Sequence, residues 1–406
     1  MRSADCVVAG CRQLLTCRGP LPKRREALGD LGLIENGWVA SEGGRIVFAG
    51  TEKDFRAEVR VLNGAVQIDA DGLIAMPGFV DAHTHLPFAG NREHEFGLRL
   101  RGWTYQQLAA EGMGILTTVR ATRAASREEL LALCLRRLDE MLLSGTTTVE
   151  AKSGYGLSVD DEIKQLEVLR DLAPLHPVDI VPTFMGAHEV PPEFSYRRED
   201  YIDLLIQTLI PEVCRRHLAE FFDVFCEPSV FSLEEAAALV RAARDAGLKI
   251  KVHADEFVTL GGAELAANLG AVSAEHLINV SEAGIRRLAE AGTAAVCLPG
   301  VSFFLMLDKT APARRLIEAG AAVALATDYN PGSSHLSSML FVLRLGVFTL
   351  KMSVEEAINA CTGNGAYAVD RDRQVGSLEP GKKMDLLLLD APDYVSLAYR
   401  PDSNPI

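Results

Sequence analysis

The central part of the chain alternates short apolar runs with amphipathic, alanine-rich segments. Runs of this length fit buried strands, and the longer amphipathic segments fit helices. Parallel strands need such a crossover between them, so the alternation predicts a parallel sheet. Eight strands close a (β/α)8 TIM-like barrel. The expected strands are 79–82, 146–151, 178–184, 221–226, 248–253, 271–275, 294–298 and 321–327.

Two of the intervening segments begin with the pattern Ser-x-x-Glu. In each pattern, the serine and the glutamate satisfy backbone donors at the start of a helix. Helices are therefore predicted to begin after Ser126 and Ser232 and to run toward Gly145 and Gly247.

The two ends of the chain differ from its centre in their pattern of apolar and polar residues. Residues 1–75 contain short β-prone runs bounded by glycine and aspartate, and residues 376–406 resemble them. Such runs are typical of a small antiparallel sheet. We expect both ends to meet in one small β-sandwich domain that flanks a barrel domain at 76–375.

Charge and composition narrow the function classes. The chain has 406 residues and a formal net charge of −14, with no basic run beyond residues 23–25. An acidic surface argues against binding to nucleic acid or to an anionic membrane. No run of ~18 apolar residues predicts a membrane span, and no signal peptide is recognised. Eight scattered cysteines without a Cys-x-x-Cys pair are typical of a reducing compartment, so a cytoplasmic protein is expected.

Reactive side chains follow the ends of the expected strands. Barrel enzymes carry their chemistry at these C-terminal ends. The residues placed there are His83, His85, Lys152, Tyr155, His188, Glu227, His253, Glu256, His276 and Asp328.

His83 and His85 are candidates for one metal site. Side chains alternate along a strand, so both imidazoles point the same way. His253 and Asp328 add two further ligand types, and a metal at such a site acidifies water and polarises carbonyls. The alternatives are ordinary hydrogen bonds for the histidines and an N-cap role for Asp328.

Glu256 is the candidate proton shuttle, because it follows His253 closely and can turn back over a metal. Asp255 is the competing carboxylate, and a surface position at a helix start is the alternative for Glu256. His276 is placed to bind the attacking water or the carbonyl oxygen, with a core histidine as its alternative.

Candidate substrate contacts lie in three loops. Arg92 could bind a carboxylate through two parallel hydrogen bonds, or could pair with Glu93 or Glu95. Tyr155 lies on a glycine-flanked loop, and Tyr105 is a weaker candidate. Residues 330–334 are expected to form a turn that leads into a helix, whose N-terminus could bind an anion or a carbonyl oxygen.

Several longer strings extend these motifs. The sequence resembles the amidohydrolase superfamily and, within it, the imidazolonepropionase family of histidine degradation. The resemblance rests on residues 77–93, 150–157, 186–189, 253–256 and 327–332, spread over most of the chain. Met113 departs from the family's usual glycine, and the family usually adds one more strand after the position of Ile406.

The resemblance implies roles for individual residues. His83, His85, His253 and Asp328 would hold a single zinc or iron ion per chain. Glu256 and His276 would activate water, with Asp328 counted as catalytic too. The substrate-binding residues would be Arg92, Tyr155, His188, Asn330, Gly332 and Ser333. No lysine follows the fourth strand, where two-metal relatives carry one, which favours one metal.

The implied reaction is hydrolysis of 4-imidazolone-5-propanoate to N-formimidoyl-L-glutamate, so the partner is a small molecule. A homodimer is compatible with the resemblance. The alternatives are a related amidohydrolase that opens another cyclic amide or deaminates a nitrogen heterocycle, and a non-enzymatic barrel. Arg92, suited to a carboxylated substrate, favours the propanoate.

Overall fold

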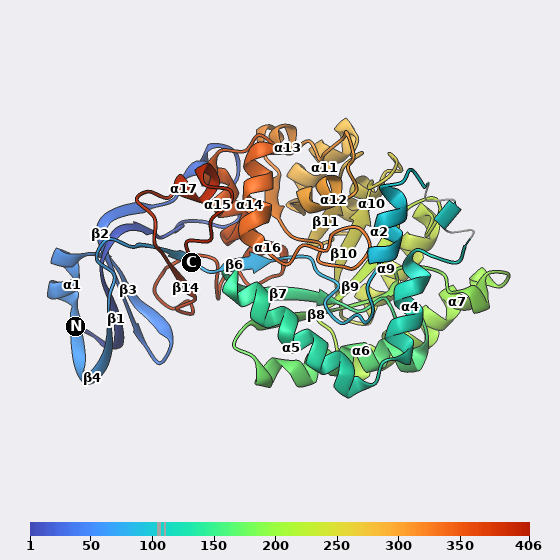
Figure 1. Cartoon of the computed structure of the whole chain (residues 1–406), viewed down its shortest axis with the longest axis horizontal. Helices are drawn as coiled ribbons and strands as arrows, with labels where there is room; N and C mark the ends of the chain where they lie inside the picture. Colours follow the sequence, from blue (N-terminus) through green and yellow to red (C-terminus); the bar gives the residue numbers. More distant parts are fainter. Residues whose placement is uncertain (104–106, 109–110) are drawn as a thin grey trace.

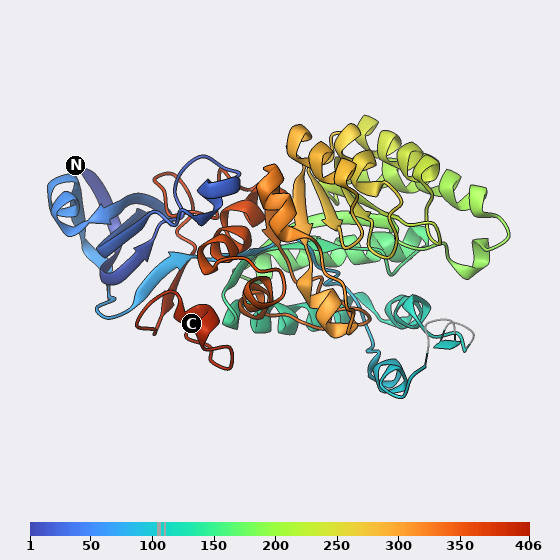
Figure 2. The same ribbon diagram turned by 90° about the horizontal axis from the view of Figure 1, so that it is seen from above.

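The computed structural model describes residues 1–103, 107–108 and 111–406. Tyr105 lies outside the described residues. A six-stranded sheet occupies one end of the molecule's long axis, and an eight-stranded barrel with its helices occupies the other (Figures 1 and 2). No helix in the described part of the chain is long and apolar enough to cross a membrane.

Eight parallel strands follow one another in chain order around the barrel. They confirm the eight expected strands, with ends shifted by a few residues. They are β6 (Phe79–Asp81), β7 (Thr146–Lys152), β8 (Asp179–Ala187), β9 (Phe221–Cys226), β10 (Lys249–Ala254), β11 (Ser273–His276), β12 (Ala294–Cys297) and β13 (Ala322–Leu325).

The barrel closes just beyond the last residues of its first and last strands. The amide of Asp328 donates to the carbonyl of His83 at 3.0 Å, and the amide of His85 donates to the carbonyl of Tyr329 at 3.0 Å. Buried Asp81 accepts from the Thr327 amide at 3.0 Å and from the Thr327 hydroxyl at 2.6 Å. The closure therefore joins the two segments that carry candidate metal ligands.

Helices cover the outside of the barrel, and the two predicted starts are confirmed. Complete capping boxes at Ser126 and Ser232 open α5 (Arg127–Leu143) and α9 (Leu233–Asp245). The other helices of this part are α2 (Glu93–Arg99), α4 (Ile115–Ala124), α6 (Val159–Leu172), α7 (Arg198–Leu204), α8 (Ile210–Arg215), α10 (Gly262–Asn268), α11 (Glu282–Ala291), α12 (Pro299–Phe304), α13 (Ala313–Ala319), α14 (Met339–Phe348), α15 (Val354–Cys361), α16 (Gly363–Ala368) and α17 (Ser396–Tyr399).

The small sheet contains strands from both ends of the chain. Its order is β14-β5-β1-β2-β3, with β4 paired to β1. The C-terminal strand lies antiparallel to β5, with Leu386 opposite Pro77. The strands are β1 (Arg2–Leu15), β2 (Leu33–Glu42), β3 (Arg45–Thr51), β4 (Val59–Asp69), β5 (Ile74–Pro77) and β14 (Leu386–Leu389).

The expectation of a purely antiparallel sheet is wrong, because β1 runs parallel to both β4 and β5. Helix α1 (Glu52–Glu58), which the sequence reading missed, provides the crossover that parallel pairing with β4 requires. Strand β1 packs on both faces: its neighbours Val7 and Val8 belong to separate apolar clusters. Strand β5 crosses the predicted boundary between residues 75 and 76, and the division of the chain into two domains stays a prediction.

Candidate active site

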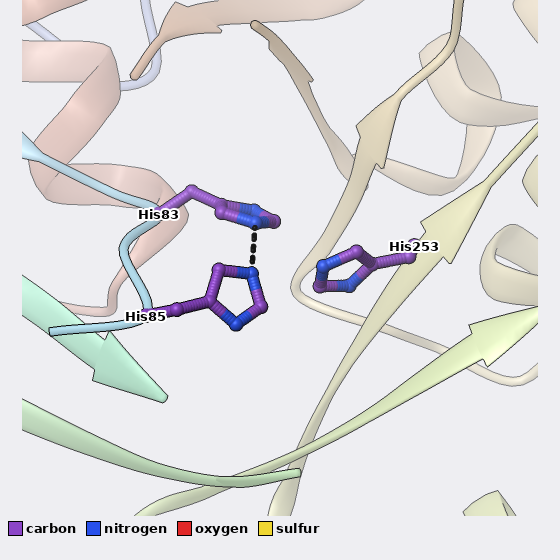
Figure 3. Close-up of side chains that lie close together, drawn as sticks. All are labelled: His83, His85 and His253. Atoms are coloured by element: carbon purple, nitrogen blue, oxygen red, sulfur yellow. Dashed lines mark hydrogen bonds between the residues drawn. The ribbon is translucent and has the colours of Figure 1, made fainter. Parts of the chain in front are cut away.

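Three imidazole rings turn toward one another at the mouth of the barrel (Figure 3). His83 and His85 follow β6, and His253 lies in β10. The Nε2 atoms of His83 and His85 are 3.3 Å apart, and the ring centroids of His83 and His253 are 4.5 Å apart. Each ring offers a ligand atom within 4.8 Å of the others. The expectation that the first two rings point the same way is confirmed, although both lie just beyond the strand, and the barrel adds the third ring.

Asp328 completes this cluster. Its Oδ1 atom lies 3.2 Å from Nε2 of His83 and 3.3 Å from Nε2 of His85. Among the described residues, neither Oδ1 of Asp328 nor Nε2 of buried His253 has a hydrogen-bond partner. Leaving such polar atoms unsatisfied away from water is costly, and a cation between them removes that cost. Three imidazoles and one carboxylate fit the ligand preferences of zinc or iron.

Two acids inside the barrel lie against the candidate ligands, and the sequence reading missed both. Asp223 Oδ2 lies 3.0 Å from Nδ1 of His253, and Glu275 Oε2 contacts Nδ1 of His83. A carboxylate on Nδ1 leaves Nε2 free for a metal. Each acid lies within a fully or mostly buried strand, Asp223 in the apolar β9 and Glu275 between Ala274 and His276 in β11, and a charge in such a strand was the available signal.

Burial controls the charge of these groups. Burial and the neighbouring His83 and His276 rings lower the pKa of His253 well below its usual value. His253 is therefore neutral, as a metal ligand must be. Burial also opposes a charge on His83, but Glu275 outweighs it and raises the pKa of His83 to about 9, so a metal that binds this ring must displace a proton.

Glu256 and His276 lie together beside the cluster, where the sequence reading expected them. Oε2 of Glu256 is 3.6 Å from Nδ1 of His276, and both side chains are buried. Burial, with Asp328 and Glu227 nearby, raises the pKa of Glu256 well above the usual range. Burial lowers the pKa of His276 to about 3, so its ring is neutral. A raised pKa makes the ionised form of Glu256 a stronger base, so beside a neutral imidazole it can accept a proton and return it.

Asp255, the competing carboxylate, accepts hydrogen bonds from backbone amides. Its Oδ1 accepts from the amides of Leu260 at 2.8 Å and Gly261 at 2.9 Å, and its Oδ2 accepts from Ala263 at 3.0 Å. It therefore anchors the start of α10, and these backbone amides engage both of its oxygens. Its backbone has φ of 52°, an unusual conformation for aspartate that turns the chain toward Glu256.

Lys152 is buried at the end of β7 and pairs with acids inside the barrel. Its Nζ lies 2.8 Å from Glu150 Oε1, 2.7 Å from Asp223 Oδ2 and 3.0 Å from Glu275 Oε2. Three carboxylates raise the pKa of this ammonium despite its burial. A permanently charged lysine is a poor candidate for a carbamate that bridges two metals, which agrees with the single-metal expectation.

Arg92 forms the ion pair that was the alternative to carboxylate binding, and its role in substrate binding stays a prediction. It pairs with Glu95, with Nε and Nη2 each 2.7 Å from Glu95 Oε2. Its remaining Nη1 faces Gly332, where a β-carbon would lie 1.9 Å away. Glu95 thus holds the guanidinium against the loop that follows Asp328, and a side chain at position 332 would displace it.

Tyr155 and His188 lie beside His85. His188 stacks on His85, with ring centroids 4.8 Å apart, and its Nδ1 donates to the Gly154 carbonyl at 3.0 Å. The Tyr155 ring lies 5.3 Å from the ring of His188. Buried Glu162 accepts from the amides of Gly154, Gly156 and Leu157 and so holds the loop of Tyr155 in place.

Asn330, Gly332 and Ser333 form a closed turn. Asn330 Oδ1 accepts from the Gly332 and Ser333 amides at 2.8 Å each, and its Nδ2 donates to the Asp328 carbonyl at 2.7 Å. The expected helix does not follow: α14 begins only at Met339, with Ser338 as its N-cap. The proposed helix N-terminus at this turn is therefore wrong, and so is the N-cap alternative for Asp328. The Asn330 side chain takes up the backbone donors that a helix start would leave free.

The roles assigned to these residues stay predictions, but the fold brings the residues themselves together as expected. The described structure gathers all four candidate ligands, Glu256, His276, Tyr155 and His188 at one end of the barrel, with Arg92 against the loop after Asp328. The eight cysteines are unpaired, as predicted for a chain without a disulfide framework.

Comparisons with known proteins agree with this geometry. The amidohydrolase family profile matches residues 74–405. The chain is 51% identical over 400 residues to imidazolonepropionase of Symbiobacterium thermophilum, covering 98% of this chain and 94% of that protein. It is also 51% identical over 395 residues to imidazolonepropionase of Geobacillus kaustophilus, covering 97% and 93%.

Solved structures share the fold at low sequence identity. An adenosine deaminase from Xanthomonas campestris with bound zinc has a TM-score of 0.69 at 19% identity, covering 98% of this chain and 89% of that one. Guanine deaminase of E. coli has a TM-score of 0.70 at 18% identity, covering 98% and 91%. These likenesses show the barrel with its small β domain and no more. The full-length sequence matches go further, and the chain belongs to the amidohydrolase family and, within it, to the imidazolonepropionases.

Proposed function

We propose that the chain hydrolyses 4-imidazolone-5-propanoate to N-formimidoyl-L-glutamate with one zinc or iron ion held by His83, His85, His253 and Asp328. The observation that carries the proposal is the convergence of these four side chains beside Glu256 at the barrel mouth. An ion held there would supply Lewis acidity, making a nearby water more acidic and the substrate carbonyl more electrophilic.

The chain's own residues would divide the remaining work. Glu256 accepts a proton from the attacking water as its oxygen bonds to the ring carbonyl carbon. The carbon–nitrogen bond of the lactam then breaks, and Glu256 returns the proton to the departing nitrogen. The carbonyl becomes a carboxyl group, which ionises to the new carboxylate and releases the second water proton, so one water is consumed for each ring opened. His276, neutral beside Glu256, donates a hydrogen bond to the oxygen on which charge develops.

Substrate binding would fall to the loops around the cluster. Arg92 presents Nη1 beyond its pairing with Glu95 and would bind the propanoate carboxylate. The Tyr155 hydroxyl stays protonated, since burial and Asp328 raise its pKa, so it can donate a hydrogen bond. His188 uses Nδ1 on the Gly154 carbonyl and keeps Nε2 for the substrate.

The test is metal analysis and turnover on one purified sample. We expect about one zinc or iron per chain, loss of imidazolone propanoate, and formation of N-formimidoylglutamate without ammonia. Removing the metal with a chelator should abolish turnover, and zinc or iron added separately should restore it. Ammonia release, or a metal-loaded protein inert on this substrate but active on another cyclic amide, would contradict the proposal.

A further inference from the structure

We propose that Phe225 is a substrate-contacting residue whose aromatic ring forms an apolar wall for the flat lactam ring in the barrel mouth, with Phe257 packed against it at the rim. The proposal rests on the proposed function and deepens it. The residues named there supply hydrogen bonds and charge to the polar groups of the substrate, and the ring that joins those groups needs a surface of its own.

Strand β9 presents Phe225 to the inside of the barrel. Phe225 follows Asp223 by two residues, so both side chains project from the same face of the strand. Asp223 Oδ2 lies 2.7 Å from Nζ of Lys152 in β7, which is not a neighbour of β9 in the sheet, so this face is the inner one. In the ladder between β9 and β10, Phe225 is paired with His253. Phe225 therefore lies beside a candidate metal ligand, at the same height in the barrel.

Three rings surround the ring of Phe225. Its centroid lies 5.5 Å from that of His253, 6.2 Å from that of His188 and 6.3 Å from that of Phe257. These separations fall in the range in which aromatic rings contact one another. Phe225 therefore reaches from a candidate metal ligand to a candidate substrate-binding histidine. Phe257, which directly follows Glu256, extends the aromatic surface toward the rim of the barrel.

The two phenylalanine rings keep apolar surface open to water, whereas the polar groups around them are enclosed. His253 and His188 are buried, but Phe225 is only partly buried and Phe257 is 55% exposed. The Phe257 amide donates to Oε1 of buried Glu227 at 2.9 Å, which holds this part of the loop in place. Apolar surface in contact with water is unfavourable, and a ligand that covers it gains free energy.

A flat ring is the ligand that fits this surface. The lactam amide is planar, so the ring that contains it is nearly flat and can pack on an aromatic side chain. Arg92 would bind the propanoate in any compound that carries it, cyclic or open. Contact with Phe225 depends on the ring, so this residue distinguishes a cyclic substrate from an open-chain amide with the same carboxylate.

The experiment compares wild type with Phe225→Ala, Phe225→Leu and Phe257→Ala, each loaded with zinc. Phe348→Ala is the control, because this phenylalanine is 59% exposed but ends helix α14 on the outside of the barrel. Zinc content and KM for imidazolone propanoate are measured on each protein. Inhibition constants are measured for hydantoin-5-propanoate, which keeps a flat lactam ring, and for glutaramate, an open-chain amide that also carries one carboxylate.

We expect Phe225→Ala to keep its zinc and to weaken KM and hydantoin-5-propanoate binding by about 10-fold, with glutaramate binding unchanged. Phe225→Leu should lose less, because leucine keeps apolar surface without a flat face. Phe257→Ala should also lose less, because its ring lies behind that of Phe225. The control should match wild type in every measurement. A phenylalanine needed only for packing would weaken both inhibitors alike.

Two results would overturn the proposal. The first is a zinc-loaded Phe225→Ala variant with wild-type KM and wild-type affinity for hydantoin-5-propanoate. The second is an equal loss of affinity for the cyclic and the open-chain inhibitor. If Phe225→Ala does not fold, Phe225→Leu and Phe257→Ala decide by the same two comparisons. Absence of turnover in zinc- or iron-loaded wild type would instead contradict the proposed function.

Discussion

Glu256 has almost no contact with solvent, and this changes its affinity for a proton. A carboxyl whose pKa is raised by burial and by nearby acids accepts a proton near neutral pH, where an exposed glutamate would not. The neighbouring carboxylate of Asp255 is also buried, but it accepts hydrogen bonds from backbone amides.

Glu256→Gln should keep the metal and lose turnover. The amide has nearly the same shape but cannot accept the proton, so kcat should fall by about 10²- to 10⁴-fold. Metal content and kcat are measured on the same preparation. Glu189→Gln is the control: this glutamate follows His188 but accepts from the Val190 amide, and its variant should turn over normally. Normal turnover in Glu256→Gln would remove the proton-shuttle role.

His253→Ala and Asp328→Ala should each lose metal and activity together, because each removes a ligand atom that has no hydrogen-bond partner among the described residues. Metal content after dialysis is the measurement. His188→Ala is the comparison: its ring stacks on His85 without joining the cluster, so the variant should retain metal. Full metal retention in His253→Ala would contradict the ligand assignment.

Arg92→Ala should raise KM more than it lowers kcat, because the guanidinium is expected to bind the propanoate and not the reacting carbonyl. Arg92→Lys should recover little, since an ammonium cannot pair with Glu95 and a second carboxylate in the same planar geometry. Steady-state kinetics on both variants check this. Equal KM values for wild type and Arg92→Ala would place the carboxylate elsewhere.

At the scale of elements, caps and loop anchors decide where the reactive side chains lie. Ser232 opens α9 with a capping box on the outside of the barrel, whereas Asp255 anchors α10 directly beside Glu256. Both residues satisfy backbone donors, but only one of them borders the site. Variants of these two residues therefore distinguish a loss of stability from a displacement of Glu256.

Ser232→Ala should cost about 1 kcal/mol of unfolding free energy and leave kcat unchanged. Asp255→Asn should also lower stability, because the amide binds the four N–H groups of residues 260–263 less strongly than a carboxylate, and it should lower kcat by displacing Glu256. Denaturant unfolding and kinetics are measured on both. Equal kcat in the two variants would show that α10 does not position Glu256.

At the scale of the whole molecule, the C-terminal tail joins the small sheet to the base of the barrel. Asp385 lies on this path: its carbonyl accepts from the Gly78 amide, and its carboxyl faces Asp179 at the start of β8. Burial and Asp179 raise the pKa of Asp385 to about 6. A raised pKa means that folding favours the protonated acid, so its contribution is complete below the unfolded pKa of ~3.9 and is lost as pH rises through about 6.

Asp385→Asn should therefore melt at a higher temperature than wild type at pH 8, with the difference vanishing near pH 4. The asparagine cannot ionise, so it avoids placing a charge beside Asp179. Thermal unfolding across this pH range is the measurement. Asp390→Asn, an exposed acid of the same tail, should show no such pH-dependent gain. Identical melting of Asp385→Asn and wild type at pH 8 would contradict the interpretation.

The sequence by itself determined the eight strands, two helix starts and the set of residues at the barrel mouth. These features depend on short-range rules: alternation in strands, capping patterns, and the position of polar residues directly after apolar runs. His83 and His85 could be paired because two residues along a strand share a face. The small sheet was predicted less well. Helix α1 was missed, and with it the crossover that makes β4 parallel to β1.

Only the tertiary structure decided how the buried charges are distributed. Asp223 and Glu275 sit on separate strands, and their contacts with His253, His83 and Lys152 arise from barrel closure. The same holds for Asp255, whose commitment to α10 separates it from Glu256, and for Asn330, whose side chain replaces the expected helix start. Long-range contacts leave no periodic trace in a single sequence, because hydrogen bonds and burial energies depend on which surfaces meet in three dimensions.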